Sequence, residues 1–418
     1  MNWRGIAVCC LLTVVCCPTL NAKAKKEKKP EKPKQEKLST LYKNARTAVK
    51  NLNEKNQKDV DAARNALLGA LSRPELNNKQ KAKIYYTAAL LEQSLNGVEN
   101  QKAFLKKPYD TAVFFNKLCD MYGQLRLCDS VDVIPDTKGN VRPAYRNKTH
   151  SLRLKHVRNI LGGGKFFLAK KNYSAAYPFF DYYCSLNDDS NATLWATLSA
   201  FLSDNYAGTV KHADAAIAYS DSATAAVLQE YKVRSYGSLG NDTAWLASLK
   251  DGLIKYPHHD WFFVQLSDWC NRHRRFDVER NLADRLIGQT GGKAIHYYAK
   301  SKSYLSEGKY DLSIASADTA IAIQPNYADA YYNKGIAYLN MAVIAQDSSP
   351  KDVNHPDYYD EKQRIQDLYK RARPCMEMVR KLQPDKIDRW GSPLYRIYLN
   401  LNMGDEFTEI DRLLNQKQ

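Results

Sequence analysis

Apolar side chains recur at three- and four-residue spacing along most of this chain, which is the pattern of helices that bury one face. In the first third, four such runs predict amphipathic helices at 38–53, 57–72, 78–96 and 108–127. The segment 131–151 lacks this spacing and carries Pro135, Gly139 and Pro143, which predict a long loop or a small hairpin. The spacing returns near residue 157 and continues toward the C-terminus, so the chain is predicted to be all-α.

The pattern also repeats at long range. Units of 34 residues begin at 192, 226, 260, 294 and 328, and looser units lie near 157 and after the unit that begins at 328. The repeating positions of the unit that begins at Ala294 are large at Tyr297 and Tyr304, small at Ser301, Gly308, Ser313 and Ala320, and proline at Pro325. Five starts at one spacing indicate an array of structural repeats.

Each repeat is predicted to be a pair of antiparallel helices. Small residues let the two helices approach, large residues fill the gaps, and proline ends the second helix because it lacks an N–H. One pair cannot bury its apolar face alone, so neighbouring pairs stack. Over about 157–418 these positions resemble the tetratricopeptide repeat (TPR) of secreted bacterial proteins. The resemblance implies a right-handed superhelical solenoid of helix-turn-helix units, preceded by an N-terminal helical region at 38–156 that ends in a basic loop.

The unit that begins at 328 carries an insertion near 341–369. Its residues Asp352, His355 and Asp357 suggest a metal loop, but their spacing fits no EF-hand and the segment holds a single His. We therefore expect a solvated loop followed by a lengthened helix from about 357 to 382, and no metal site.

The N-terminus has the pattern of a secretory signal peptide at 1–24, with an apolar run from Ile6 to Cys17 that is too short to cross a bilayer. A lipoprotein in which Cys16 or Cys17 carries the lipid is the less favoured alternative. Residues 25–37 are rich in Lys and predict a flexible linker. We expect an extracytoplasmic protein of the periplasm or the outer membrane, with no transmembrane span in the mature chain.

The net charge of +17 is unevenly distributed. Residues 181–418 hold 28 Lys and Arg against 31 Asp and Glu, whereas 137–180 hold ten Lys and Arg and no acid. Such a block favours a polyanion, here an anionic polysaccharide or lipid, and export disfavours nucleic acid. A basic surface that only aids solubility is an equal alternative. The predicted basic patch comprises Lys138, Arg142, Arg146, Lys148, Arg153, Lys155 and Arg158.

The TPR resemblance also implies a concave groove lined by the first helix of each repeat. Aromatic side chains mixed with charges suit a peptide groove, because they give a large contact area at a small entropy cost. We expect a non-enzymatic protein–protein interaction scaffold that binds a peptide or protein segment there. Packing between helices is the alternative role for some of these residues. The predicted groove residues are Arg234, Trp261, Asp268, Arg272, Tyr298, Lys302, Tyr332 and Asn340.

No catalytic motif stands out in the sequence. Three glycines at 162–164 precede Lys165, but Phe166 occupies the place where a phosphate-binding loop needs Ser or Thr. Gly164 falls instead on a small position of the repeat. We expect no enzyme activity and no cofactor.

Five cysteines lie outside the signal segment. Cys119 and Cys128 are close enough in sequence to pair in an oxidising compartment. An odd and widely spread set argues against a disulfide framework, so buried free thiols are the favoured interpretation.

Overall fold

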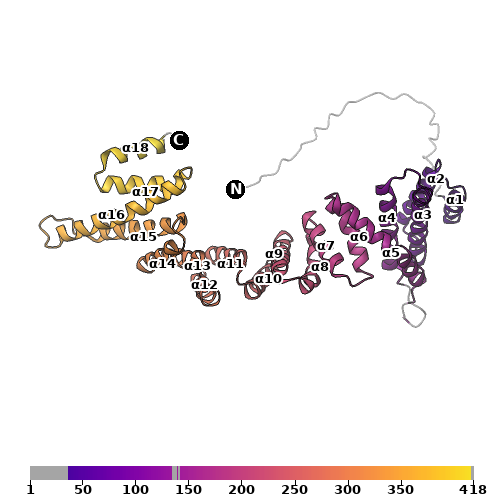
Figure 1. Cartoon of the computed structure of the whole chain (residues 1–418), viewed down its shortest axis with the longest axis horizontal. Coiled ribbons are helices and arrows are strands. Elements are labelled where there is room, and N and C mark those ends of the chain that lie inside the picture. The colour runs from indigo at the N-terminus through magenta and orange to yellow at the C-terminus, as the bar shows by residue number, and fades with distance from the viewer. Residues whose placement is uncertain (1–35, 134–138, 140–141, 416–418) are drawn as a thin grey trace, which may run out of the picture. The chain divides into compact units, whose positions relative to one another are not determined.

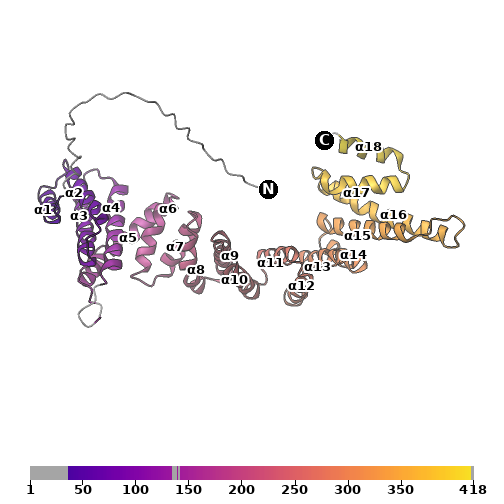
Figure 2. The same ribbon diagram turned by 180° about the vertical axis from the view of Figure 1, so that it is seen from behind.

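The computed structural model describes residues 36–133, 139 and 142–415 (Figure 1 and Figure 2). Within these residues the chain forms eighteen α-helices and no strand, which confirms the all-α prediction. None of these helices is long and apolar enough to span a membrane. The predicted signal peptide, most of the Lys-rich linker and Lys138 lie outside the described residues.

The chain divides into two compact units, Met1–Thr149 and His150–Gln418. The boundary falls within helix α5 (Arg146–Ala169), and the predicted boundary at residue 156 lies in the same helix. Because α5 begins at Arg146, the predicted loop at 131–151 is too long at its C-terminal end.

The helices of the first unit are close to those that the apolar spacing predicts. The long helix α3 (Asn78–Phe104) begins with a capping box, in which the Asn77 side chain accepts from the backbone N–H of Gln80 and the Gln80 side chain accepts from the backbone N–H of Asn77. Its apolar face packs against α1 and α2, in a cluster where Leu67 of α2 and Ile84 and Leu95 of α3 are fully buried. The helices are α1 (Leu38–Lys50), α2 (Gln57–Gly69), the 3₁₀ turn η1 (Ala70–Ser72), α3 (Asn78–Phe104) and α4 (Thr111–Val131).

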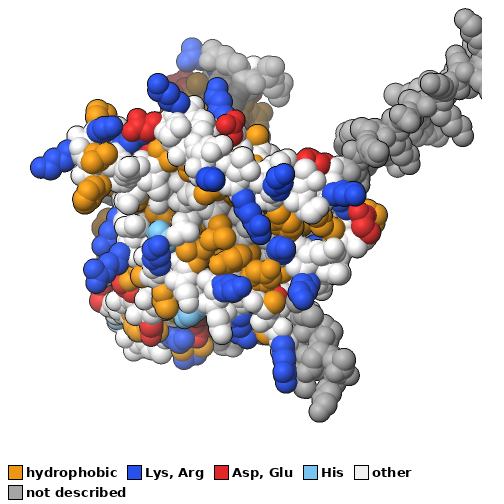
Figure 3. Space-filling model, turned by 90° about the vertical axis from the view of Figure 1, so that its right-hand side faces the viewer, with side chains coloured by type: hydrophobic (Ala, Val, Ile, Leu, Met, Phe, Trp, Pro, Cys, Tyr) orange, Lys and Arg blue, Asp and Glu red, His pale blue; other side chains and the backbone are white. Residues whose placement is uncertain are grey.

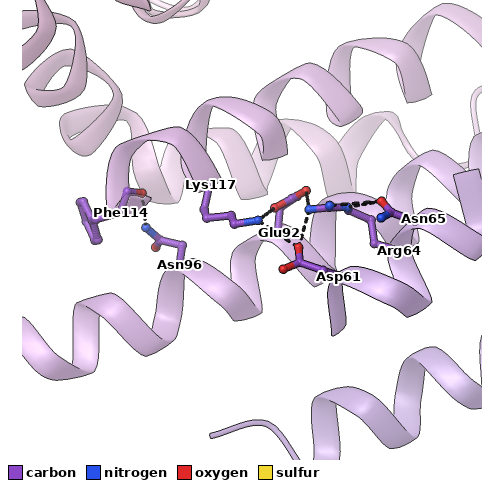
Figure 4. A network of polar contacts seen from close by, with 7 residues as sticks. All are labelled: Asp61, Arg64, Asn65, Glu92, Asn96, Phe114 and Lys117. Atoms are coloured by element: carbon purple, nitrogen blue, oxygen red, sulfur yellow. Dashed lines mark hydrogen bonds and ion pairs between the residues drawn. The ribbon is translucent and has the colours of Figure 1, made fainter. Parts of the chain in front are cut away.

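A buried carboxylate joins three helices of this unit (Figure 4). Glu92 of α3 pairs with Arg64 of α2 and, at 3.4 Å from Oε2 to Nζ, with Lys117 of α4. Asp61 lies 2.9 Å from Arg64 Nη1 and 3.1 Å from Lys117 Nζ. Burial raises the pKa of Glu92, and Lys117 and Arg64 oppose that rise. The two cations therefore offset the cost of burying this charge.

We expect Arg64→Ala to lower the free energy of unfolding of the first unit by about 3 kcal/mol, because it leaves a buried carboxylate short of one partner. The variant's pKa for Glu92 will rise further, so protonation relieves the penalty as the pH falls. Urea unfolding followed by circular dichroism should show a larger loss at pH 8 than at pH 5. Lys58→Ala, an exposed change on the same helix, should stay within about 0.5 kcal/mol of wild type. A penalty independent of pH would contradict this account.

The second unit is an array of helix pairs. Helices α11, α13 and α15 begin at the predicted repeat starts 260, 294 and 328, whereas α7 and α9 begin two and four residues before 192 and 226. The bounds after α5 are α6 (Tyr173–Cys184), α7 (Ser190–Leu202), α8 (Tyr206–Tyr219), α9 (Ser222–Ser238), α10 (Asp242–Lys255), α11 (Asp260–Arg272), α12 (Phe276–Thr290), α13 (Ala294–Ser306), α14 (Tyr310–Ile323), α15 (Ala328–Ser348), α16 (Tyr358–Leu382), α17 (Ile387–Asn400) and α18 (Gly404–Asn415).

Proline ends the second helix of three repeats. Helices α10, α14 and α16 each stop two residues before a proline, at Pro257, Pro325 and Pro384. The missing N–H and the restricted residue before the ring both prevent another turn.

Small residues allow the helices to approach. A Cβ at Gly164 would stand 2.6 Å from a ring carbon of Phe180, and one at Gly252 would stand 2.5 Å from Phe262. In the repeat that begins at Ala294, Ser301 and Ser313 are fully buried and their hydroxyls lie 3.1 Å apart. Gly164 therefore serves helix packing, as its repeat position predicts.

We expect Gly164→Ala to destabilise the second unit by about 2 kcal/mol, because the methyl group overlaps a fully buried aromatic ring. Gly288→Ala is the matched control, since Gly288 is exposed in α12 and a Cβ there meets nothing within 4 Å. That change should stabilise the helix by about 0.5 kcal/mol. Thermal unfolding of both variants would measure the difference, and equal midpoints would contradict the packing role of Gly164.

The insertion near 341–369 is mostly helical. Helix α16 begins at Tyr358, close to the expected start, but α15 also runs on to Ser348, which the sequence interpretation did not foresee. The added turns bury Ala345 of α15 and Leu368 and Tyr369 of α16 in one cluster. Only 349–357 remain outside the two helices, and 351–357 are exposed.

Candidate partner-binding surface

The first helices of successive repeats contact one another, as α7 with α9, α13 with α15, and α15 with α17. From α9 to α17, side chains on the first helix of one repeat contact side chains on the first helix of the next. Most of the predicted groove residues take part in these contacts, which we call bridges. We call this set the first-helix row. It comprises Arg234, Trp261, Asp268, Tyr298, Lys302, Tyr327, Asp329, Tyr332 and Arg389.

The row begins where α9 meets α11. The guanidinium of Arg234 lies over the ring of Trp261, 5.1 Å from its centroid, in a cation–π contact. Glu230 Oε1 lies 2.5 Å from Nη2 of Arg234, and Glu230 Oε2 lies 2.9 Å from Nε2 of His259. Trp261 is half-buried and Arg234 is exposed, so the pair is positioned in advance and still reaches solvent.

One ion pair links helices α11 and α13. Asp268 Oδ1 lies 3.9 Å from Lys302 Nζ, and this long contact between an exposed carboxylate and a half-buried ammonium has a small energetic value. Arg272 is one turn beyond Asp268 and does not join this bridge. It lines a hollow of about 780 Å³ beside α10, together with Trp245, Trp269 and His273. Arg272 Nε also donates to the backbone carbonyl of Asp268 at 3.4 Å, so Arg272 contacts the first-helix row without joining its side-chain bridges.

Helices α13, α15 and α17 meet at an aromatic cluster. The rings of Tyr298 and Tyr327 are 5.2 Å apart, and Tyr332 lies under the guanidinium of Arg389 at 4.5 Å. Arg389 pairs with Asp329 at 2.5 Å. Burial raises the pKa of Tyr298 to about 12, so its hydroxyl remains a hydrogen-bond donor at neutral pH.

Sequence reasoning missed several members of this surface. Asp329 occupies the second position of its repeat, as Trp261 does, so the repeat register could have found it. Arg389 follows the insertion, which breaks the 34-residue spacing, and Glu230 acts only through Arg234 and His259. Asn340, which was predicted, lies half-buried on α15 about two turns beyond Tyr332 and outside these bridges.

The predicted basic patch is divided between the two units. Arg142, Arg146 and Lys148 belong to the first unit, and Arg153, Lys155 and Arg158 to the second. Side chains turn by about 100° per residue along a helix, so Arg146 and Arg153 point to one side of α5 and Lys148 and Lys155 to nearly the opposite side. Arg153 is also half-buried.

Buried Asp181 in the second unit has structural partners. Burial raises the pKa of Asp181, but hydrogen bonds from His212 and Lys211 dominate and lower it to about 2. These contacts join α6 to α8. Among the described residues, no group of three His, Cys, Asp or Glu is placed to hold a metal ion.

The five described cysteines are free thiols. Cys119 and Cys128, which the sequence left open as a pair, are not bonded to each other. The Cys128 thiol donates to the backbone carbonyl of Ala82 at 3.3 Å. Burial and the neighbouring Asp120 raise the pKa of Cys119 to about 12, so that thiol is unreactive at neutral pH.

One family match agrees with this architecture. Residues 302–341 match the TPR repeat family. No curated protein matches the sequence. The chain is similar to the C-terminal part of a TPR repeat-containing protein from Cytophaga hutchinsonii, with 12% identity, 59% of this chain and 91% of that chain covered, and a TM-score of 0.41.

A TPR repeats protein from Bacteroides fragilis is 17% identical, with 59% of this chain and 96% of that chain covered and a TM-score of 0.31. The TPR domain of P58(IPK) is 12% identical, with 91% of this chain and 99% of that chain covered and a TM-score of 0.28. The described part of the chain is thus an all-α array of helix pairs, of which residues 302–341 match the TPR repeat family.

Proposed function

We propose that this tetratricopeptide-repeat protein is a non-enzymatic scaffold of the cell envelope, and that its first-helix row binds a segment of a partner protein. The observation that supports the proposal is the series of side-chain bridges from α9 to α17. Each bridge places an aromatic ring or an ion pair on the first helix of a repeat.

The chemistry of the row suits a polypeptide. Trp261, Tyr298 and Tyr332 supply apolar contact area, and their positions are fixed by packing, so little entropy is lost on binding. Cations alternate with Asp268 and Asp329, which suits mixed polar and charged groups rather than a uniform polyanion. The protonated hydroxyl of Tyr298 adds a hydrogen-bond donor for a backbone carbonyl.

The envelope location rests on the signal pattern at 1–24 and stays a proposal. Deleting these residues should retain the protein inside the cell, and fractionation would measure the change. The second candidate is a binder of anionic glycan or lipid through the basic block 137–180. We favour the first-helix row, because the charges of α5 point to different sides of the helix.

We expect Trp261→Ala together with Tyr298→Ala to reduce cross-linking to native envelope partners by about tenfold or more, since aromatic anchors dominate such interfaces. Cross-linking in intact cells, followed by quantitative mass spectrometry, compares each variant with wild type. Tyr359→Ala is the matched control, because Tyr359 is 66% exposed and outside the row.

Circular dichroism must show that the double variant keeps its helical content. Identical partner sets from the double variant and wild type would rule out binding by the first-helix row. If Tyr359→Ala lost the same partners as the double variant, the loss would not be specific to the first-helix row, and binding would be assigned to another surface.

A further inference from the structure

A groove in the first unit has an aromatic floor and a basic rim. It encloses about 650 Å³ between α1, α3 and the segment at Tyr145, and we call it the N-terminal groove. Figure 3 looks onto this end of the chain and shows apolar side chains surrounded largely by Lys and Arg. The groove is lined by Tyr42, Ala45, Arg46, Val49, Lys50, Lys83, Tyr86, Thr87, Leu90, Leu91, Gln93, Ser94, Tyr145 and Lys148.

The floor is built from tyrosines and aliphatic side chains. The rings of Tyr86 and Tyr145 lie 5.1 Å apart. Buried Asp132 fixes Tyr145 by accepting from its backbone N–H at 2.6 Å. Val49 and Leu90 are 37% and 36% exposed, so apolar surface is open to an occupant that the fold itself does not supply.

The rim carries four cations, Arg46, Lys50, Lys83 and Lys148, and the described residues that line the groove include no Asp or Glu. Two of the cations lie over the floor, with Lys83 Nζ 4.5 Å from the Tyr42 centroid and Lys148 Nζ 5.5 Å from that of Tyr145. Like charges around a concave apolar surface repel one another and concentrate a positive potential in it. Both effects favour an anionic occupant.

Tyr42 adds a second, independent observation. Its hydroxyl is shielded from solvent and has no hydrogen-bond partner among the described residues. Burial raises the pKa of Tyr42 to about 12, so the group stays a proton donor at neutral pH. A buried donor without a partner is unfavourable, and a side-chain shift that opens it to an acceptor would relieve this cost.

We propose that the N-terminal groove binds an acidic segment of a partner protein, in which carboxylates alternate with apolar side chains. The lining of α1 runs from Tyr42 to Lys50, which is about 12 Å of helix and matches about four residues of extended chain. Apolar and polar lining groups alternate along this length. That arrangement fits alternating side chains better than the continuous apolar surface that a lipid acyl chain requires. The site lies in a different unit from the first-helix row and is independent of it.

The test is fluorescence anisotropy of the full chain with a short labelled peptide of alternating Glu and Leu. We expect saturable binding that weakens with added salt, and no binding when Lys replaces Glu in the peptide. Lys83→Glu and Lys50→Glu should each weaken binding by about tenfold, because each replaces an attraction with a repulsion. Lys58→Glu makes the same charge change on exposed α2, outside the groove, and should bind as wild type does.

Lys83→Arg keeps the charge and should retain binding, which separates electrostatics from loss of fold. Equal weakening by Lys58→Glu and Lys83→Glu would overturn the proposal, as would absence of peptide binding. Vesicles of phosphatidylglycerol are the comparison probe: binding to vesicles without binding to the peptide would overturn the peptide occupant. Trp261→Ala should leave the affinity unchanged, so the two binding proposals fail separately.

Discussion

The close approach of paired helices is the constraint on which the array depends. Gly164 and Gly252 stand against buried aromatic rings at distances that admit no side chain, and Ser301 and Ser313 meet through their hydroxyls. Close packing sets how the first helices of successive repeats lie beside one another. The side chains from Arg234 to Arg389 lie close together because those helices are neighbours. The same packing that forms the core therefore also forms the proposed partner surface.

Buried charged side chains fix the alignment of helices that small residues allow to approach. Glu92 pairs with cations of two other helices, and Asp181 of α6 pairs with His212 and Lys211 of α8. Breaking such a pair leaves an uncompensated charge in a poorly polarisable interior. These contacts select one alignment of each helix against its neighbour, which apolar packing alone would leave less defined.

The sequence predicted the fold well because helix pairing is local. The 34-residue spacing, the three prolines and the small positions all act within one repeat or between adjacent ones, so periodicity reveals them. Arg389 lay beyond the insertion, where the spacing no longer applies. The N-terminal groove was missed for another reason: Tyr42, Lys83 and Tyr145 come from three segments that have no shared period and that only folding brings together.

The insertion lengthens two helices of one repeat. The added turns of α15 and α16 bury Ala345 against Leu368 and Tyr369, so the new residues supply one another's packing partners. A repeat can therefore acquire a projecting helical hairpin in one step, and its exposed tip at 351–357 is free to diverge in sequence without a cost to the array.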